Sequence, residues 1–104
     1  MRLVEEEQFG TALPVIRYSD LDEALEQANR THYGLGALVW SGDVERGAKV
    51  VRELDSGTGW VNQHMDVVPF APIGGAKWSG IGYGGGRWGY EAYTELQVIN
   101  SKWV

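Results

Sequence analysis

Apolar and polar residues follow one another with two different spacings along the first part of the chain. Residues 12–19 (ALPVIRYS) are mostly apolar and partly β-branched, a composition that favours a strand. Asp20 follows, with Glu23 three residues later, which is the pattern of a helix N-cap and capping box. Apolar residues then recur with helical spacing at Leu21, Ala24, Leu25 and Ala28. This pattern predicts a strand and then a helix that ends near residues 29–31.

The same order of elements repeats over residues 36–62. A second apolar run, GALVWS at residues 36–41, ends at Ser41, and either Ser41 or the following Asp43 can cap a helix. The apolar face of that helix comprises Val44, Ala48, Val51 and Leu54. GTGWVN at residues 57–62 predicts a third strand. Because strand–helix–strand units with short links pair their strands in parallel, we expect an α/β fold with a small, mainly parallel βαβαβ sheet and two flanking helices.

The pattern changes after Asn62. Residues 63–86 contain two prolines and many glycines, which predicts a long, ordered Gly/Pro-rich loop. Loops of this length are usually functional or covered by another part of the structure. Residues 87–96 (RWGYEAYTEL) favour a short helix, and residues 96–104 (LQVINSKWV) alternate well enough to predict a C-terminal strand.

Charge and composition exclude several classes of function. The formal net charge is −5 and the lysines and arginines are scattered, so the chain lacks the basic face that nucleic acids and anionic membranes require. No apolar run approaches the roughly 20 residues that span a bilayer, and the start MRLVEEEQF lacks the apolar core of a signal peptide. We therefore expect a cytoplasmic location, with no nucleic-acid and no membrane partner.

The metal-binding and nucleophilic side chains are few. The chain contains no cysteine, which excludes disulfides, thiolate metal sites and a cysteine nucleophile within it. His32 and His64 each stand in a loop without a second ligand at metal spacing, so we predict no metal site.

One glycine-rich stretch has the form of a phosphate-binding motif. Residues 80–85 (GIGYGG) fit the pattern GxGxxG. A dinucleotide fingerprint needs a buried strand directly before the first glycine and a helix that starts at the last one. Neither flank is present, because FAPIGGAKWS precedes the motif and another glycine follows it. We interpret the stretch as a tightly folded loop whose glycines allow close backbone approach.

Several motifs in the same order resemble the aldehyde dehydrogenase superfamily. Residues 71–99 (APIGGAKWSGIGYGGGRWGYEAYTELQVI) resemble its segment P-F-G-G-x-K-x-S-G-x-G-R-E-x-G-x-x-G-x-x-x-Y-T-E, which lies near the end of these enzymes. EEQFGTALPV at residues 6–15 is similar to the family's E-E-x-F-G-P. Residues 31–62 resemble its stretch from Y-G-L-x-A-x-V-[FW]-[ST] to G-x-x-x-[VI]-N. The resemblance covers essentially the whole chain.

The resemblance implies a division of the chain and a partner. Residues 1–95 correspond to part of a catalytic domain, and residues 96–104 correspond to a tail strand that reaches a neighbouring subunit. It therefore implies a homo-oligomer formed through Leu96–Val104, with NAD or NADP as the family's cofactor.

The resemblance also implies site residues. Glu7 corresponds to the glutamate that hydrogen-bonds the nicotinamide ribose hydroxyls, and Phe9 to the aromatic residue beside the nicotinamide ring. A carboxylate suits vicinal hydroxyls because it accepts two hydrogen bonds; read without the resemblance, Glu7 belongs to a solvated acidic run. The loop at residues 63–72 corresponds to the wall of the substrate tunnel. Its apolar candidates, which ordinary core packing explains equally well, are Met65, Val67, Val68, Phe70 and Ile73.

The sequence also departs from the family. Thr11 replaces a proline, Ile73 replaces the aromatic residue of P-F-G-G, and Tyr83-Gly84 replaces the arginine–glutamate pair that anchors the loop. The cysteine nucleophile is missing, and the general base and nucleotide-binding domain precede this segment in the family. We therefore expect a C-terminal region that is catalytically incomplete alone, inactive as a dehydrogenase and without tightly bound cofactor.

Two other functions remain open. The chain can be a stand-alone module of the same fold that binds a partner or forms an oligomer. It can also be a small serine-dependent, esterase-like hydrolase that uses Ser56 or Ser79 with His64 and Asp66, although the G-x-S-x-G elbow typical of such enzymes is not in the sequence.

Overall fold

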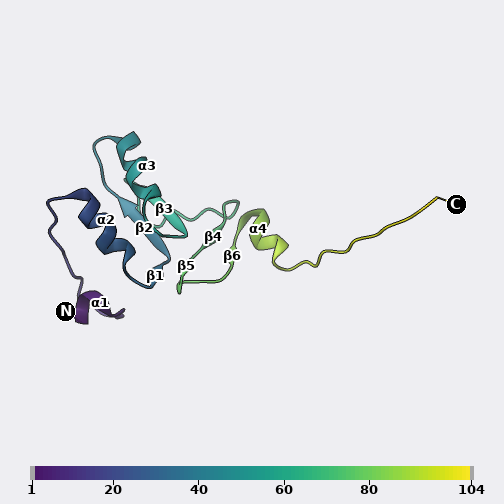
Figure 1. Cartoon of the computed structure of the whole chain (residues 1–104), viewed down its shortest axis with the longest axis horizontal. Helices are drawn as coiled ribbons and strands as arrows, with labels where there is room; N and C mark the ends of the chain where they lie inside the picture. Colours follow the sequence, from purple (N-terminus) through teal and green to yellow (C-terminus); the bar gives the residue numbers. More distant parts are fainter. Residues whose placement is uncertain (1, 104) are drawn as a thin grey trace.

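The computed structural model describes residues 2–103 and shows an elongated molecule. Its extents are 71 × 32 × 24 Å and its radius of gyration is 18.6 Å, whereas a compact domain of this length has a radius of about 13 Å. The accessible surface is 9293 Å², compared with about 5,800 Å² for a compact monomer of the same mass. Figure 1 shows the cause, because a body of helices and short strands continues into a long C-terminal tail.

A parallel strand pair with a helical crossover forms the centre of the body. β2 (Gly36–Val39) pairs in parallel with β3 (Thr58–Val61), and α3 (Val44–Arg52) connects them. The carboxylate of Asp43 caps α3 by accepting a hydrogen bond of 3.0 Å from the backbone N–H of Arg46. The second half of the predicted βαβαβ pattern is therefore present with its expected helix cap.

Small residues let α3 lie close to this strand pair. A methyl group on Gly59 of β3 would press against the side chain of Val51, and one on Gly47 of α3 would press against Val61. Glycine at these two positions therefore allows helix and sheet to approach closely.

Trp60 forms the core on the opposite face of the pair. Trp60 is 5% exposed, and among the described residues no other large hydrophobic side chain is buried. Its indole N–H donates a hydrogen bond of 3.0 Å to the carbonyl oxygen of Asp66, so the ring is both buried and satisfied.

α2 (Leu21–Asn29) lies beside this unit, as the sequence predicted. Asp20 caps it, since its carboxylate accepts a hydrogen bond of 2.9 Å from the backbone N–H of Glu23. The predicted apolar face is only partly covered: Leu21, Ala24 and Leu25 are half-buried and Ala28 is exposed. A four-residue helix, α1 (Arg2–Glu5), precedes it and was not predicted.

The prediction of a mainly parallel βαβαβ sheet is wrong. The described residues form three two-stranded sheets, of which only β2–β3 is parallel. β1 (Tyr33–Gly34) pairs antiparallel with β5 (Ala76–Lys77), and β4 (Ile73–Gly74) pairs antiparallel with β6 (Tyr83–Gly84). Residues 12–19 are extended but form no strand. A strand needs a neighbour for its backbone hydrogen bonds, and none of the described residues pairs with this segment.

The C-terminal part also differs from the prediction. α4 (Gly86–Glu91) is shorter than the expected helix at residues 87–96. The predicted final strand is absent over residues 96–103, and Val104 lies outside the described residues. Figure 1 shows this tail leaving the body beyond α4, where it meets no second strand. None of the described helices is long and apolar enough to cross a membrane.

Candidate functional site

The predicted tunnel residues divide into two groups. We call residues 63–73 the wall loop. Val67, Val68 and Ile73 lie together beside Trp60 around a hollow of about 50 Å³. Met65 and Phe70 instead are 55% and 78% exposed. The structure therefore brings three of the five candidates together around this hollow, although Val67 is itself 48% exposed, and it places the other two outside the hollow.

Asn62 holds the start of the wall loop. Its side chain exchanges two hydrogen bonds with the backbone of Ser41: the carbonyl oxygen Oδ1 accepts from N–H at 2.7 Å and Nδ2 donates to the carbonyl at 2.8 Å. Its own N–H donates to the carbonyl of Val39 at 2.9 Å. Asn62 has φ of 55°, a conformation that asparagine tolerates better than most residues. The sequence did not predict this role, because Ser41 lies 21 positions before Asn62.

Lys77 holds the segment that follows the wall loop. Its Nζ donates to the carbonyl oxygens of Asn29 at 2.5 Å and Thr31 at 3.1 Å, and it lies 3.3 Å from Oδ2 of Asp55. The two carbonyls belong to the C-terminal end of α2 and the turn after it. This residue was also missed, because its partners are 22 to 48 positions away in the sequence.

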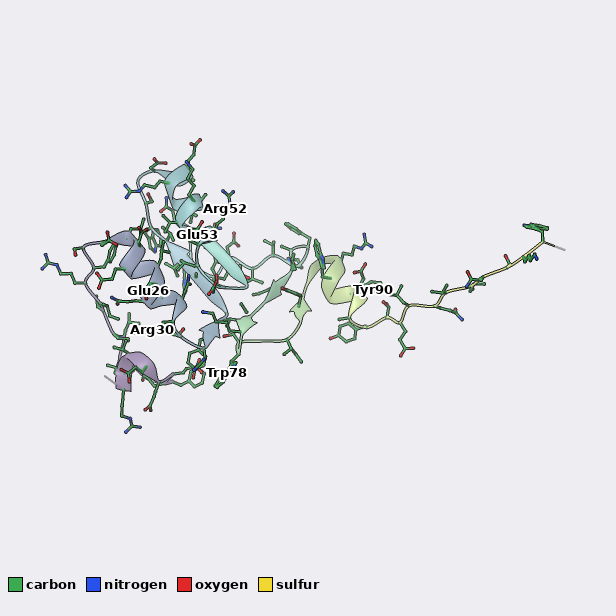
Figure 2. The ribbon with its side chains drawn as sticks, viewed as in Figure 1. Glu26, Arg30, Arg52, Glu53, Trp78 and Tyr90 are labelled. Carbon is green, nitrogen blue, oxygen red and sulfur yellow. The ribbon has the colours of Figure 1, made fainter. Side chains whose placement is uncertain are left out.

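Asn29 joins the ends of the two long helices. Its Nδ2 donates to the carbonyl of Glu53 at 2.6 Å, and its Oδ1 accepts from the N–H of Asp55 at 2.8 Å. Glu53 is the C-cap of α3, and Figure 2 shows it at the end of that helix next to Arg52. The ends of α2 and α3 and the segment after the wall loop therefore meet in one polar cluster.

The glycine-rich turn (residues 74–86) is attached to β1 and the residues before it through its own backbone and through Ser79. The hydroxyl of Ser79 accepts a hydrogen bond of 2.9 Å from the N–H of Gly34, and the N–H of Trp78 donates to the carbonyl of His32 at 3.0 Å. The rings of His32 and Trp78 stack with centroids 4.5 Å apart. Figure 2 shows Trp78 on the side of β5 that faces the N-terminal region.

Several glycines in this turn and beside it have no room for side chains. A methyl group on Gly57 would overlap the backbone of Gly74, and one on Gly75 would overlap the backbone of Ser79. Gly85 has φ of 73° and Gly86 φ of 55°. This geometry differs from a dinucleotide fingerprint, in which a buried strand leads directly into the first glycine.

The predicted cofactor residues lie in the exposed N-terminal segment. Glu7 lines a hollow of about 460 Å³ together with Gly34 and Ser79, and Phe9 is 98% exposed. No hydrogen bond or ion pair engages the Glu7 carboxylate within residues 2–103. Both of its oxygens are therefore available to a ligand.

The serine hydrolase arrangement is not assembled. The hydroxyl of Ser56 donates to the carbonyl of Thr58 at 3.2 Å, and that of Ser79 accepts from Gly34. Within residues 2–103, neither hydroxyl has a hydrogen bond to His64 or Asp66. The described part of the chain also holds no group of three or more side chains placed to bind a metal ion.

Comparison with known proteins gives one consistent result. Residues 1–99 match the family described as "Aldehyde dehydrogenase family". The chain is 44% identical over 99 residues to betaine aldehyde dehydrogenase of Bacillus subtilis and 43% identical over 99 residues to phenylacetaldehyde dehydrogenase of Pseudomonas fluorescens. Each match covers 95% of this chain and 20% of the relative. The chain thus spans a fifth of the length of these relatives.

Solved structures agree. Crystal structures of betaine aldehyde dehydrogenase from Staphylococcus aureus, one of an apo variant and one in complex with NAD+, superpose with a TM-score of 0.85 at 40% identity. They cover 89% of this chain and 19% and 18% of the respective Staphylococcus chains. An NAD-dependent aldehyde dehydrogenase from Sinorhizobium meliloti superposes with a TM-score of 0.85 at 38% identity, over 90% of this chain and 19% of that one.

Proposed function

The chain belongs to the aldehyde dehydrogenase family, and we propose that it is the C-terminal segment of an NAD(P)-dependent enzyme that oxidises an aldehyde to a carboxylic acid. The observation that carries the proposal is the match of nearly the whole chain to one fifth of each relative. The surface of 9293 Å² supports it, because a chain that normally packs against the rest of an enzyme leaves apolar faces uncovered when it stands alone.

In this proposal the segment supplies walls for the substrate and contacts for the cofactor. NAD(P), when bound, accepts the hydride that leaves the substrate. The two free oxygens of Glu7 would accept hydrogen bonds from the ribose hydroxyls, and the exposed ring of Phe9 would lie against the nicotinamide. The cluster of Val67, Val68 and Ile73 beside Trp60 would form one apolar side of the aldehyde pocket.

The segment does not supply the nucleophile. Oxidation in this family proceeds through attack by a cysteine thiolate, and these 104 residues contain no cysteine. The thiolate and the general base would therefore come from residues outside this sequence, and the chain by itself is expected to be inactive.

A chimera tests the proposal. The C-terminal fifth of the Bacillus subtilis betaine aldehyde dehydrogenase is replaced by this chain, and oxidation of betaine aldehyde is followed by NADH formation. We expect an active chimera, while the relative without its last fifth and this chain alone are inactive. A chimera that folds, by circular dichroism and gel filtration, but has no activity would contradict the proposal, as would aldehyde oxidation by this chain alone.

We further propose that the tail forms contacts between subunits. The tail residues that expose their side chains most are Leu96, Val98, Ile99 and Trp103. An uncovered apolar strand sequence associates with other chains unless it is covered, so a closed homo-oligomer follows. Deleting residues 97–104 should convert the particle to a monomer or an aggregate in light scattering coupled to gel filtration, whereas Lys102→Ala should not. A full chain that runs as an 11.5 kDa monomer at micromolar concentration would refute this.

A further inference from the structure

Of the three lysines in the sequence, Lys77 is held in a way that the other two are not. Lys49 lies exposed on α3 and Lys102 lies in the extended tail. The Lys77 side chain is only 24% exposed, and its ammonium group meets two backbone carbonyls and one carboxylate. Such a set of partners is typical of a fixed cation and not of a solvated surface lysine.

The partners lie where α2 needs a cation. The last carbonyls of a helix have no partner within the helix and carry partial negative charge. The ammonium of Lys77 supplies this cation. It donates hydrogen bonds to the carbonyl of Asn29, the last residue of α2, and to the carbonyl of Thr31 in the following turn. The carboxylate of Asp55 balances its charge, and the side chain of Asn29 fixes the backbone of Asp55.

The backbone conformation of Lys77 indicates that its surroundings hold it in place. Lys77 has φ of 53°, a region that residues with a Cβ atom rarely occupy. It also pairs with Tyr33 across the β1–β5 ladder. The local conformation is unfavourable for lysine, and the contacts of its side chain and its backbone pairing hold it.

The chain between Lys77 and the wall loop is short and is held mainly through its backbone. Ala76–Lys77 pair with β1, and Ile73–Gly74 pair with β6. The small residues at positions 74–76 add few side-chain contacts of their own. Because only three residues separate Lys77 from Ile73, we expect a shift of Lys77 to be passed on to Ile73, which lines the hollow beside Trp60.

We propose that Lys77 is a positioning residue, which clamps the end of the wall loop to the C-terminal end of α2 and so sets the shape of the apolar pocket. The clamp itself concerns this chain alone; its consequence for an aldehyde pocket rests on the proposed function. Asn62 holds the other end of the loop, so the two residues together fix both ends.

Amide hydrogen exchange in the 104-residue chain tests the clamp. In Lys77→Met, which keeps most of the aliphatic stem but removes the charge, exchange at Gly34 and Trp78 should become about tenfold faster, because their N–H groups bond to this region. Exchange at Asn62 should not change. Lys49→Met is the matched control and should exchange like the parent, and Lys77→Arg should recover most of the protection because it keeps the cation. Equal exchange in the parent and Lys77→Met would overturn the clamp.

The chimera tests the consequence. In the chimera, the factor by which Lys77→Met raises the KM for the aldehyde should be about ten times the factor by which it raises the KM for NAD. Lys49→Met should leave both KM values unchanged. Equal changes in the two constants, or none, would overturn the role in shaping the pocket. An inactive parent chimera would instead contradict the proposed function, and the exchange experiment would still decide on the clamp.

Discussion

The strands of the β2–α3–β3 unit (residues 36–62) and the extended segment at residues 12–19 are both rich in residues that favour strands. Only the strands of the unit pair with each other. In the unit, the backbone pairs from Gly36–Thr58 to Val39–Val61, and Trp60 is buried. In the extended segment no ladder forms, and Val15 is 88% exposed. The tail at residues 95–103 behaves like the second case.

The difference shows that β-propensity alone does not make a strand. The paired residues of β2 and β3 are 22 positions apart, and the capped helix α3 between them brings them together at small cost in loop entropy. Residues 12–19 and 95–103 have no such partner among the described residues. Their strand sequences therefore remain unpaired, and their apolar side chains remain in water.

The largest effect should follow from truncating the core of the paired unit. Trp60→Ala removes the buried indole and should lower the free energy of unfolding by about 3–5 kcal/mol. Trp103→Ala should change it little, since Trp103 is 98% exposed. Urea denaturation at low protein concentration, followed by far-UV circular dichroism, measures both; equal losses would mean that the tail packs on the body of its own chain.

A smaller but clear loss should follow from filling a glycine that has no space. Gly57→Ala places a methyl group on the backbone of Gly74 and should cost about 1–3 kcal/mol. Gly82→Ala is the matched control, because nothing lies within 4 Å of its added methyl group. If both variants melt together with the parent, the turn is looser than described.

Removing a helix cap should cost less again. The Asp43 carboxylate accepts a hydrogen bond from the N–H of Arg46, and Asp43→Ala should lower stability by about 1 kcal/mol. Asp43→Asn keeps an oxygen in place to accept the same bond and should lose at most a few tenths of this amount. Thermal melts of the parent, Asp43→Ala and Asp43→Asn separate these outcomes. An Asp43→Ala variant as stable as the parent would argue against the cap.

Deleting residues 97–104 should have the smallest effect on the stability of the paired unit. The described tail residues contribute no ladder and no buried side chain, so the urea midpoint at low protein concentration should match that of the full chain. A lower midpoint under these conditions would show that the tail packs on the body.

The sequence predicted the elements that depend on near neighbours. The caps Asp20 and Asp43 and the apolar faces of α2 and α3 are local signals, and both helices are present. The parallel pair was predicted because a short crossover restricts the pairing. The prediction of a strand at residues 12–19 was wrong, because the backbone pairing of a strand depends on a segment that is distant in the sequence or belongs to another chain.

The candidate site was predictable only in part, for the same reason. Resemblance pointed to the wall loop, and Val67, Val68 and Ile73 do lie together. Whether Glu7 and Phe9 bind a cofactor stays a prediction, as does the division into residues 1–95 and 96–104. The roles of Asn62 and Lys77 could not be predicted, since their hydrogen bonds join positions that only the folded chain brings together.

Amide hydrogen exchange in the isolated chain and in the chimera tests whether this chain is a segment that the rest of an aldehyde dehydrogenase completes. We expect residues 36–39 and 58–62 to be protected in both proteins. At low protein concentration, where contacts between subunits through the tail are lost, residues 12–19 and 95–103 should exchange rapidly in the isolated chain, and they should become protected in the chimera. Protection of residues 12–19 in the isolated chain, or rapid exchange of both terminal segments in an active chimera, would contradict the claim that this chain is a segment completed by the rest of an aldehyde dehydrogenase.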